Sequence, residues 1–370
     1  MPVNPFARIL NEKRAPETPE AAIKAAATLY HAWFTGLMLH LTLRKGAEVA
    51  GKWTFRLFRR QHLEKFKSSF DKLGLTHLPD AVAAAQYHYL SNSVGGVEVE
   101  FIPESDTKAW VHFCHPRWMF QGTALCGLPV EVSRGFLEGW YGHNGVSLNN
   151  PRLGFVCVSE DMTGQYGLAG YFKEFGHALA PHERLQFAPG ETAPPFDPGK
   201  APGLDAASWP PARLIKANRN YAMEYIKTGL NELCALIGPA EARDIAGHAA
   251  ALIGRQFYRE LQSLMGLAEE DDSPAAFAHF MERMAGAQDD KLSWEEKDGA
   301  LFLHLDGWRL MRGRENVPHE AYEAWIRLWE GCLAVHNRFL KLETIARQDY
   351  GDPETVLRIR AVSENRASLA

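Results

Sequence analysis

The sequence predicts an α+β fold of two tandem homologous domains, each with the element order ααα-ββ-α-ββ and an antiparallel sheet. Two observations predict it. The same order of helical and alternating apolar segments occurs on both sides of a proline- and glycine-rich stretch, and residue patterns recur in register between the two sides. We therefore expect a first repeat at 15–178, a Pro-rich linker at 179–211 and a second repeat at 212–362, with the repeats packed as a pseudo-twofold pair.

The first repeat begins where Thr18 precedes Pro19 and Glu20, a pattern typical of an N-cap followed by proline in the first helical turn. Helical periodicity predicts helices at about 18–45, 48–73, 79–90 and 130–140. Alternation of apolar and polar residues predicts strands at 97–102, 109–114, 153–158 and 168–172.

The second repeat shows the same order. Helices are expected at about 212–236, 240–264, 274–284 and 319–332. Strands are expected at 292–296, 301–305, 340–346 and 355–359.

Individual residues also align between the halves. Thr35-Gly36-Leu37 matches Thr228-Gly229-Leu230, and the segment 153–173 matches 340–360 without a gap. Other matched positions are Pro79 with Pro274, Trp118 with Trp308, and Phe136 and Trp140 with Trp325 and Trp329. These registers favour duplication, and the aromatic residues at helical spacing indicate core.

Composition excludes several classes of protein. Hydrophobic residues make up 46% of the 370 residues and charged residues 23%, which is typical of a globular chain. A net charge of −5 argues against a nucleic-acid or membrane-surface partner, and no apolar run reaches the length of a membrane span. The first 21 residues show no signal peptide, and the five cysteines are scattered, so we expect a cytoplasmic protein with reduced thiols.

The polar loop before the strand at 153–158 is the first candidate site. It contains His143, Asn144, Asn149 and Arg152, and His115, Arg117 and Trp118 follow an earlier strand. Histidine suits a general base, whereas asparagine and arginine suit the binding of an oxyanion or carboxylate. We expect His143, His115 and Asn144 to be catalytic and Arg117, Trp118, Asn149 and Arg152 to bind substrate. Ordinary turn chemistry is the alternative, because Asn-Gly and Asn-Pro are common turn dipeptides.

The second half has a shorter counterpart of this loop. His336-Asn337-Arg338 precedes the strand at 340–346 and makes His336 and Arg338 further substrate-binding candidates, against the alternative of a solvated strand entrance. Cys126 has apolar flanks, which favour an inert thiol over a nucleophile. The sequence contains no phosphate loop, dinucleotide fingerprint, nucleophile elbow or zincin motif, so we expect no cofactor.

The order of helices, hairpin, helix and hairpin, closing with Arg347-x-Asp349-Tyr350-Gly351-Asp352, resembles two related families. One is the 4-vinyl reductase-type domain, a small-ligand module that also forms the effector-sensing region of phenol-responsive transcriptional activators. The other is the bacterial L-2-amino-thiazoline-4-carboxylate hydrolase-like family. The sensor domains carry zinc-binding cysteines near the last hairpin, whereas 351–356 has none here. We therefore expect no structural zinc, although a histidine-based catalytic metal stays open.

The resemblance implies two functions, and a third stays open beside them. The hydrolase-like family implies a cytosolic hydrolase that acts on a carbon–nitrogen bond of a small cyclic or amide substrate, carboxylate-bearing or aromatic. The vinyl reductase-type domain implies a non-catalytic module that binds or senses a small aromatic molecule. A dimerising scaffold is the third possibility. The expected partners are thus a small-molecule substrate or ligand and a second copy in a homodimer.

Overall fold

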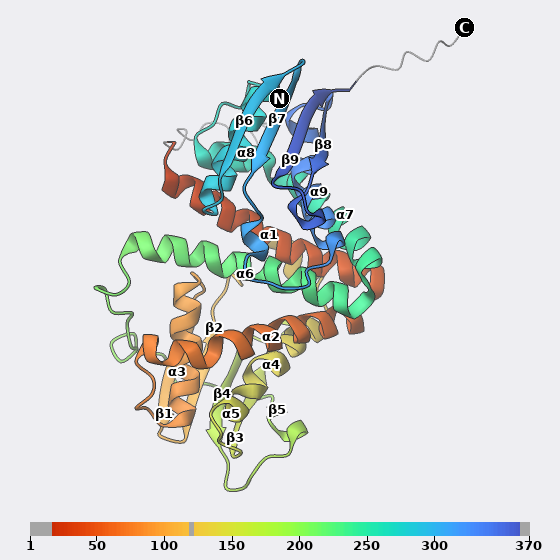
Figure 1. Ribbon diagram of the computed structural model, residues 1–370. Helices are drawn as coiled ribbons and strands as arrows, with labels where there is room; N and C mark the ends of the chain where they lie inside the picture. The colour runs from red at the N-terminus through yellow and green to blue at the C-terminus, as the bar shows by residue number, and fades with distance from the viewer. Residues whose placement is uncertain (1–16, 118–121, 363–370) are drawn as a thin grey trace, which may run out of the picture. The chain divides into compact units, whose positions relative to one another are not determined.

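The computed structural model describes residues 17–117 and 122–362, which fold into two compact units of mixed helix and strand (Figure 1). Unit A is formed by residues 30–249 and unit B by the described residues of 1–29 and 250–370. The boundaries between the units fall within the long helices α1 (Pro19–Lys45) and α7 (Pro239–Met265). The predicted limits of the repeats, at 178 and 212, stay a prediction.

Each predicted helix and strand is present, with ends that differ from the expected ones by a few residues. The remaining helices of unit A are α2 (Ala47–Leu73), α3 (Asp80–Val94), α4 (Val130–Gly139), the single turn α5 (Asn144–Ser147) and α6 (Pro211–Ile237). Its strands are β1 (Val99–Ser105), β2 (Lys108–Phe113), β3 (Leu153–Ser159), β4 (Leu168–Glu174) and β5 (Leu185–Phe187). Unit B adds α8 (Pro274–Ala287), α9 (His319–His336), β6 (Leu292–Lys297), β7 (Ala300–Leu305), β8 (Leu340–Ala346) and β9 (Thr355–Ala361).

The sheets of the two units share one strand order. Unit A has the order β1-β2-β4-β3-β5 and unit B the order β6-β7-β9-β8. The four strands that the units have in common pair antiparallel, and the additional strand β5 pairs parallel with β3. In both sheets the third of these four strands, which follows a helix in the chain, pairs with the fourth strand and lies at its outer side. The order across each sheet is therefore first, second, fourth, third.

Unit A has apolar side chains on both faces of its sheet. On the helical face, aromatic rings of α3 pack with those of the strands: the ring of His88 stacks on Phe172 with centroids 5.4 Å apart, and that of Tyr89 lies 5.9 Å from Phe101. On the other face Ile102, Trp110 and Tyr171 form a second cluster, against which Phe175 and Phe196 pack. The Pro-rich stretch 179–211 thus covers part of the sheet instead of running free, and its β5 extends the sheet.

Glycine brings pairs of helices close together in both units. In unit A a Cβ on Gly135 of α4 would lie 2.4 Å from the carbonyl oxygen of Gly51 in α2. In unit B a Cβ on Gly331 of α9 would lie 2.2 Å from the carbonyl oxygen of Ala251 in α7. Because no side chain fits at either contact, these positions require glycine for the backbones to approach this closely.

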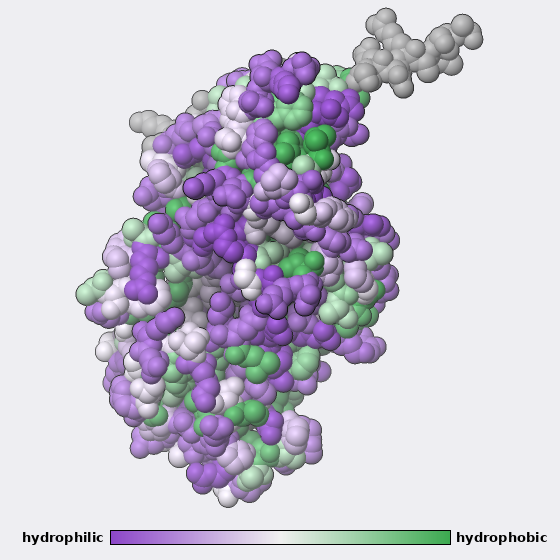
Figure 2. All heavy atoms as spheres, in the orientation of Figure 1, coloured by the Kyte–Doolittle hydropathy of each residue, from purple (hydrophilic) through white to green (hydrophobic). Residues whose placement is uncertain are grey.

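The face of the molecule drawn in Figure 2 is mostly polar. Figure 2 shows that hydrophobic residues on the visible face lie in small patches separated by hydrophilic ones. Among the described residues, no helix has the length and apolar character needed to cross a bilayer.

Candidate functional site

The loop predicted to be catalytic folds into short helical turns. Tyr141–His143 forms a 3-10 turn, and Asn144–Ser147 forms α5. The half-buried ring of His143 lies 5.2 Å from that of His62. Burial, together with the charges of Arg59 and Arg184, lowers the pKa of His143 to about 4. His143 is therefore neutral at pH 7 and a weak base, since a general base works best with a pKa near the operating pH.

Asn144 holds the loop against a buried histidine. Its side-chain nitrogen donates to the carbonyl oxygen of Tyr141 (3.1 Å) and to Nε2 of His88 (2.9 Å). Burial keeps the pKa of His88 well below its usual range, so this ring is neutral. A separate hydrogen bond of 2.8 Å joins Nε2 of His62 to Oγ of Ser147 in the same loop. These contacts give Asn144 a structural role in the core of unit A.

The arginine candidates have different ion-pair partners. Arg117 is buried, pairs with the carboxylate of Asp161 and lies over the ring of Phe113 at 5.0 Å. Arg152 lies at the surface and pairs with Glu174 at 3.2 Å. Neither ion pair includes His143, so the hydrolase interpretation stays a prediction.

The other candidates of unit A are at the surface. His115 and Asn149 are exposed, and Asn149 has a φ of 58°, the left-handed backbone that asparagine tolerates in turns. Trp118 lies outside the described residues.

The candidates of unit B are also separate. His336 is buried, accepts from the hydroxyl of Tyr258 (2.7 Å) through Nδ1 and donates to the carbonyl oxygen of Ser273 (2.8 Å) through Nε2. Burial lowers the pKa of His336, so it joins the end of α9 to the start of α8 as a neutral ring. Arg338 is exposed and stacks on Phe339. Neither residue lines the cavity described next.

A pocket lies in unit B between α8, α9 and the sheet. The free space within its walls, counted together with the open solvent that adjoins it, amounts to about 460 Å³. Its apolar wall is formed mainly by Met281, Met284, Trp325 and Trp329. We call this space the aromatic pocket. Its wall is typical of small-molecule sites, which are largely apolar with a few polar groups.

Two polar groups of the aromatic pocket stand out. The Asp290 side chain is only 3% exposed; it accepts from the backbone N–H of Arg309 (3.1 Å) and from Arg312 (3.3 Å). Burial raises its pKa to about 6, against the opposing effects of that N–H and the two arginines. The indole N–H of Trp308 is buried and has no hydrogen-bond partner among the described residues. A buried N–H without a partner costs about 1–3 kcal/mol.

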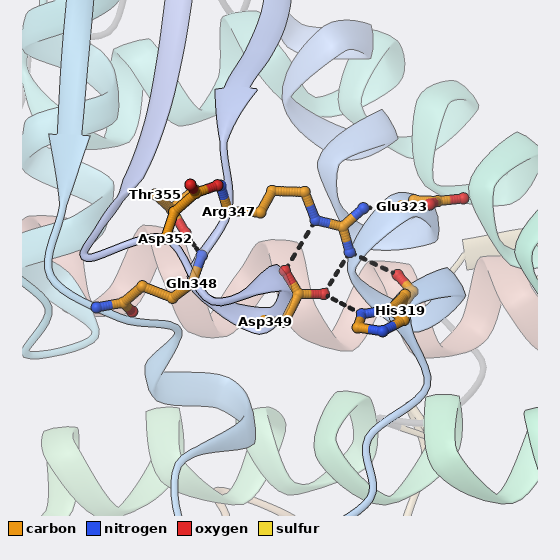
Figure 3. Close-up of polar contacts among 7 residues, drawn as sticks. All are labelled: His319, Glu323, Arg347, Gln348, Asp349, Asp352 and Thr355. Carbon is orange, nitrogen blue, oxygen red and sulfur yellow. Dashed lines mark hydrogen bonds and ion pairs between the residues drawn. The ribbon is translucent and has the colours of Figure 1, made fainter.

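The turn that carries the family resemblance supports one wall of this pocket. Arg347 donates through Nε to Asp349 (2.8 Å), pairs with Glu323 (3.1 Å) and donates to the carbonyl oxygen of His319 (Figure 3). Its guanidinium lies 4.7 Å from the ring centre of Tyr322, a residue of the pocket wall. These contacts join the turn to α9 beside Tyr322.

The aromatic stripe of α9, predicted as core, has a second role. Trp325 and Trp329 are indeed buried, and they also form the pocket wall. Asp290 is not among the residues that the sequence pattern singles out. The signal that could have indicated it is the acidic pair Asp289-Asp290 shortly before a strand that begins with leucine.

Comparisons with known proteins add no relative: no family model, curated protein or solved structure matches this chain.

Proposed function

We propose that the chain binds a small aromatic molecule in the aromatic pocket of unit B. The observation that carries the proposal is a wall of indole, phenol and thioether groups, which includes Trp308, whose N–H has no partner in the part of the chain that the structure describes. Met281 and Met284 adapt to the shape of an aromatic ring, and Trp325 and Trp329 offer faces and edges for stacking.

Ligand polarity follows from the position of the two polar groups. An acceptor atom on the ring's substituent satisfies the N–H of Trp308, which is otherwise buried at a cost. Asp290 already accepts from the backbone N–H of Arg309 and from Arg312, so it does not require a cationic ligand. We therefore expect a neutral aromatic ligand with one hydrogen-bond acceptor, such as an aryl ketone, aldehyde or phenol.

The test is a titration followed by tryptophan fluorescence, with acetophenone as the probe that carries an acceptor and ethylbenzene as its apolar counterpart. Ala285 lines the pocket, and Ala285→Leu fills the space; Ala275→Leu makes the same change at an exposed position of α8. We expect saturable binding of acetophenone by the parent chain and by Ala275→Leu, and its loss in Ala285→Leu. Equal binding by all three would place the ligand elsewhere and overturn the proposal.

A second variant tests the hydrogen bond. Trp308→Phe keeps an aromatic wall and removes the N–H, so acetophenone should bind roughly tenfold more weakly while ethylbenzene is unaffected. If Trp308→Phe changes the affinity for both probes to the same extent, the indole N–H has no part in recognition.

We further propose that the two halves arose by duplication. The common strand order supports it, as does a charge exchange at matched positions. In the alignment that matches Phe136 with Trp325, Arg134 corresponds to Glu323. In the alignment that matches Leu153 with Leu340, Glu160 corresponds to Arg347. Arg134 pairs with Glu160 in unit A through two bonds of 2.9 Å, and Glu323 pairs with Arg347 in unit B at 3.1 Å. The same contact is thus made with the charges reversed.

A further inference from the structure

A cluster of metal-ligating side chains lies on the β1–β2 hairpin of unit A, apart from the aromatic pocket. Glu100 and His112 are paired across the strands, and the N–H of Cys114 donates to the carbonyl oxygen of Glu98 at the neighbouring position. Because side chains alternate along a strand, Glu100, His112 and Cys114 project from the same face of the sheet. A hairpin register, and not nearness in the sequence alone, brings the three together.

The ligand atoms of these three residues all lie within 4.8 Å of one another. Nδ1 of His112 donates to the carboxylate of Glu100 at 2.7 Å. In a tetrahedral zinc site the ligand atoms lie about 2.0–2.3 Å from the metal, and therefore roughly 3.3–3.8 Å apart. Small side-chain rotations bring the three atoms to that spacing, because all three residues are only half-buried.

The surroundings hold the histidine ring in place. The ring of Tyr166 lies edge-on at 5.7 Å, and a Cβ at Gly167 would come within 3.0 Å of Nε2 of His112. Farther along the same face, Ile102 and Trp110 belong to the apolar cluster covered by Phe196. The three ligand residues therefore lie beside this apolar cluster, on and next to two paired strands.

We propose that Glu100, His112 and Cys114 bind one zinc ion and leave one coordination position open. A thiolate, an imidazole and a carboxylate are the three side-chain types that zinc takes, and three protein ligands with an open fourth position are typical of catalytic rather than structural sites. The charges also fit, since one carboxylate and one thiolate balance the charge of the ion.

Electrostatics without the ion disfavours the thiolate. Burial and the carboxylates of Glu100 and Glu98 raise the pKa of Cys114, so the apo protein keeps this thiol protonated. A divalent cation reverses the balance, because it is attracted by the same carboxylates and stabilises the thiolate. Binding at this site therefore releases the thiol proton to solvent.

The experiment uses the full chain, reduced and freed of metal by a chelator, and titrates it with cobalt(II) and then zinc. A thiolate–cobalt charge-transfer band in the near ultraviolet reports Cys114, and zinc should displace the cobalt and remove the band. The matched variants are Cys114→Ser and Cys126→Ser, the latter changing an exposed cysteine outside the cluster.

We expect one equivalent of cobalt to give the band in the parent chain and in Cys126→Ser, and no band in Cys114→Ser. Glu100→Gln, which keeps an acceptor for His112, should weaken zinc binding by more than the roughly 10–100-fold loss that follows removal of an outer hydrogen-bond partner. A band that survives Cys114→Ser, or an affinity for zinc that is the same in Cys114→Ser and Glu100→Gln as in the parent chain, would overturn the proposal. Unchanged circular dichroism of the metal-free variants excludes misfolding as the cause.

Discussion

Replacement of Asp290 by asparagine should stabilise the protein at alkaline pH. Burial raises the pKa of this carboxyl from 3.8 to about 6 in the folded chain. The folded state therefore binds the proton more tightly than the unfolded state. The protonated carboxyl makes its full contribution to folding stability below pH 3.8, and this contribution is lost as the pH rises through 6. The difference between a pKa of 3.8 and one of about 6 corresponds to about 3 kcal/mol at pH 8, since a tenfold change in an equilibrium constant is about 1.4 kcal/mol.

The asparagine side chain resembles the protonated carboxyl in shape and remains able to accept from the N–H of Arg309. The ion pair that is lost with Asp290 is weak, because the side chain of Arg312 is 58% exposed. We therefore expect Asp290→Asn to raise the free energy of unfolding by about 2–3 kcal/mol at pH 8, and by progressively less as the pH falls below about 6. Urea unfolding of variant and parent, measured at each pH, gives the difference directly.

The control is Asp298→Asn, which changes an exposed carboxyl in the β6–β7 turn of the same unit and should alter stability little at any pH. The reasoning is refuted if Asp290→Asn has no stabilising effect at pH 8, or if its effect is the same at pH 4 and pH 8. Either result would mean that the buried carboxylate is better solvated or better paired than its position indicates.

Two further predictions concern packing and the matched ion pairs. Gly331→Ala should destabilise the protein by roughly 1–3 kcal/mol, because its methyl group would press on the carbonyl of Ala251. Gly286→Ala on α8, where nothing lies within 4 Å, should instead stabilise it by up to about 1 kcal/mol. Urea unfolding measures both changes, and equal effects would contradict the close helix contact. Arg134→Glu should lower the free energy of unfolding by about 1–3 kcal/mol, because it sets a like charge beside the buried Glu160. The exchange Arg134→Glu/Glu160→Arg should recover most of that loss. A double variant no more stable than the single one would contradict the proposal that the ion pairs of the two halves are equivalent.

Secondary structure can be predicted closely from this sequence because its helices and strands carry clear periodicity. The pattern predicts α6 at 212–236, and the helix runs over Pro211–Ile237; it predicts β8 at 340–346, and the strand has those ends. Strand β5 is not predicted, because three residues inside a proline-rich stretch give no periodic signal. Its place depends on pairing with β3, and that contact is visible only in three dimensions.

The candidate site cannot be predicted in the same way, because polarity in a loop does not reveal where the side chains point. The turn alternative is the better interpretation for Asn149, whose left-handed backbone is what asparagine tolerates. The metal cluster escapes prediction for another reason. The ligand set joins His112 to Glu100 across two strands, and the register that pairs them is not visible in the sequence.

The two units also differ in how they use α4 and α9, the helices that the proposed duplication would match. In unit A the chain leaves the helical path at Trp140, and the next residue turns inward: the ring of Tyr141 stacks on His88 at 3.8 Å and lies 5.5 Å from Phe172. In unit B, α9 continues without a break through Trp329 to His336, so no ring at the matched position turns toward the sheet. The loop that was predicted to be catalytic therefore supplies core to unit A. In unit B, α9 was predicted to be plain core and carries no such insertion; its Trp325 and Trp329 line the aromatic pocket.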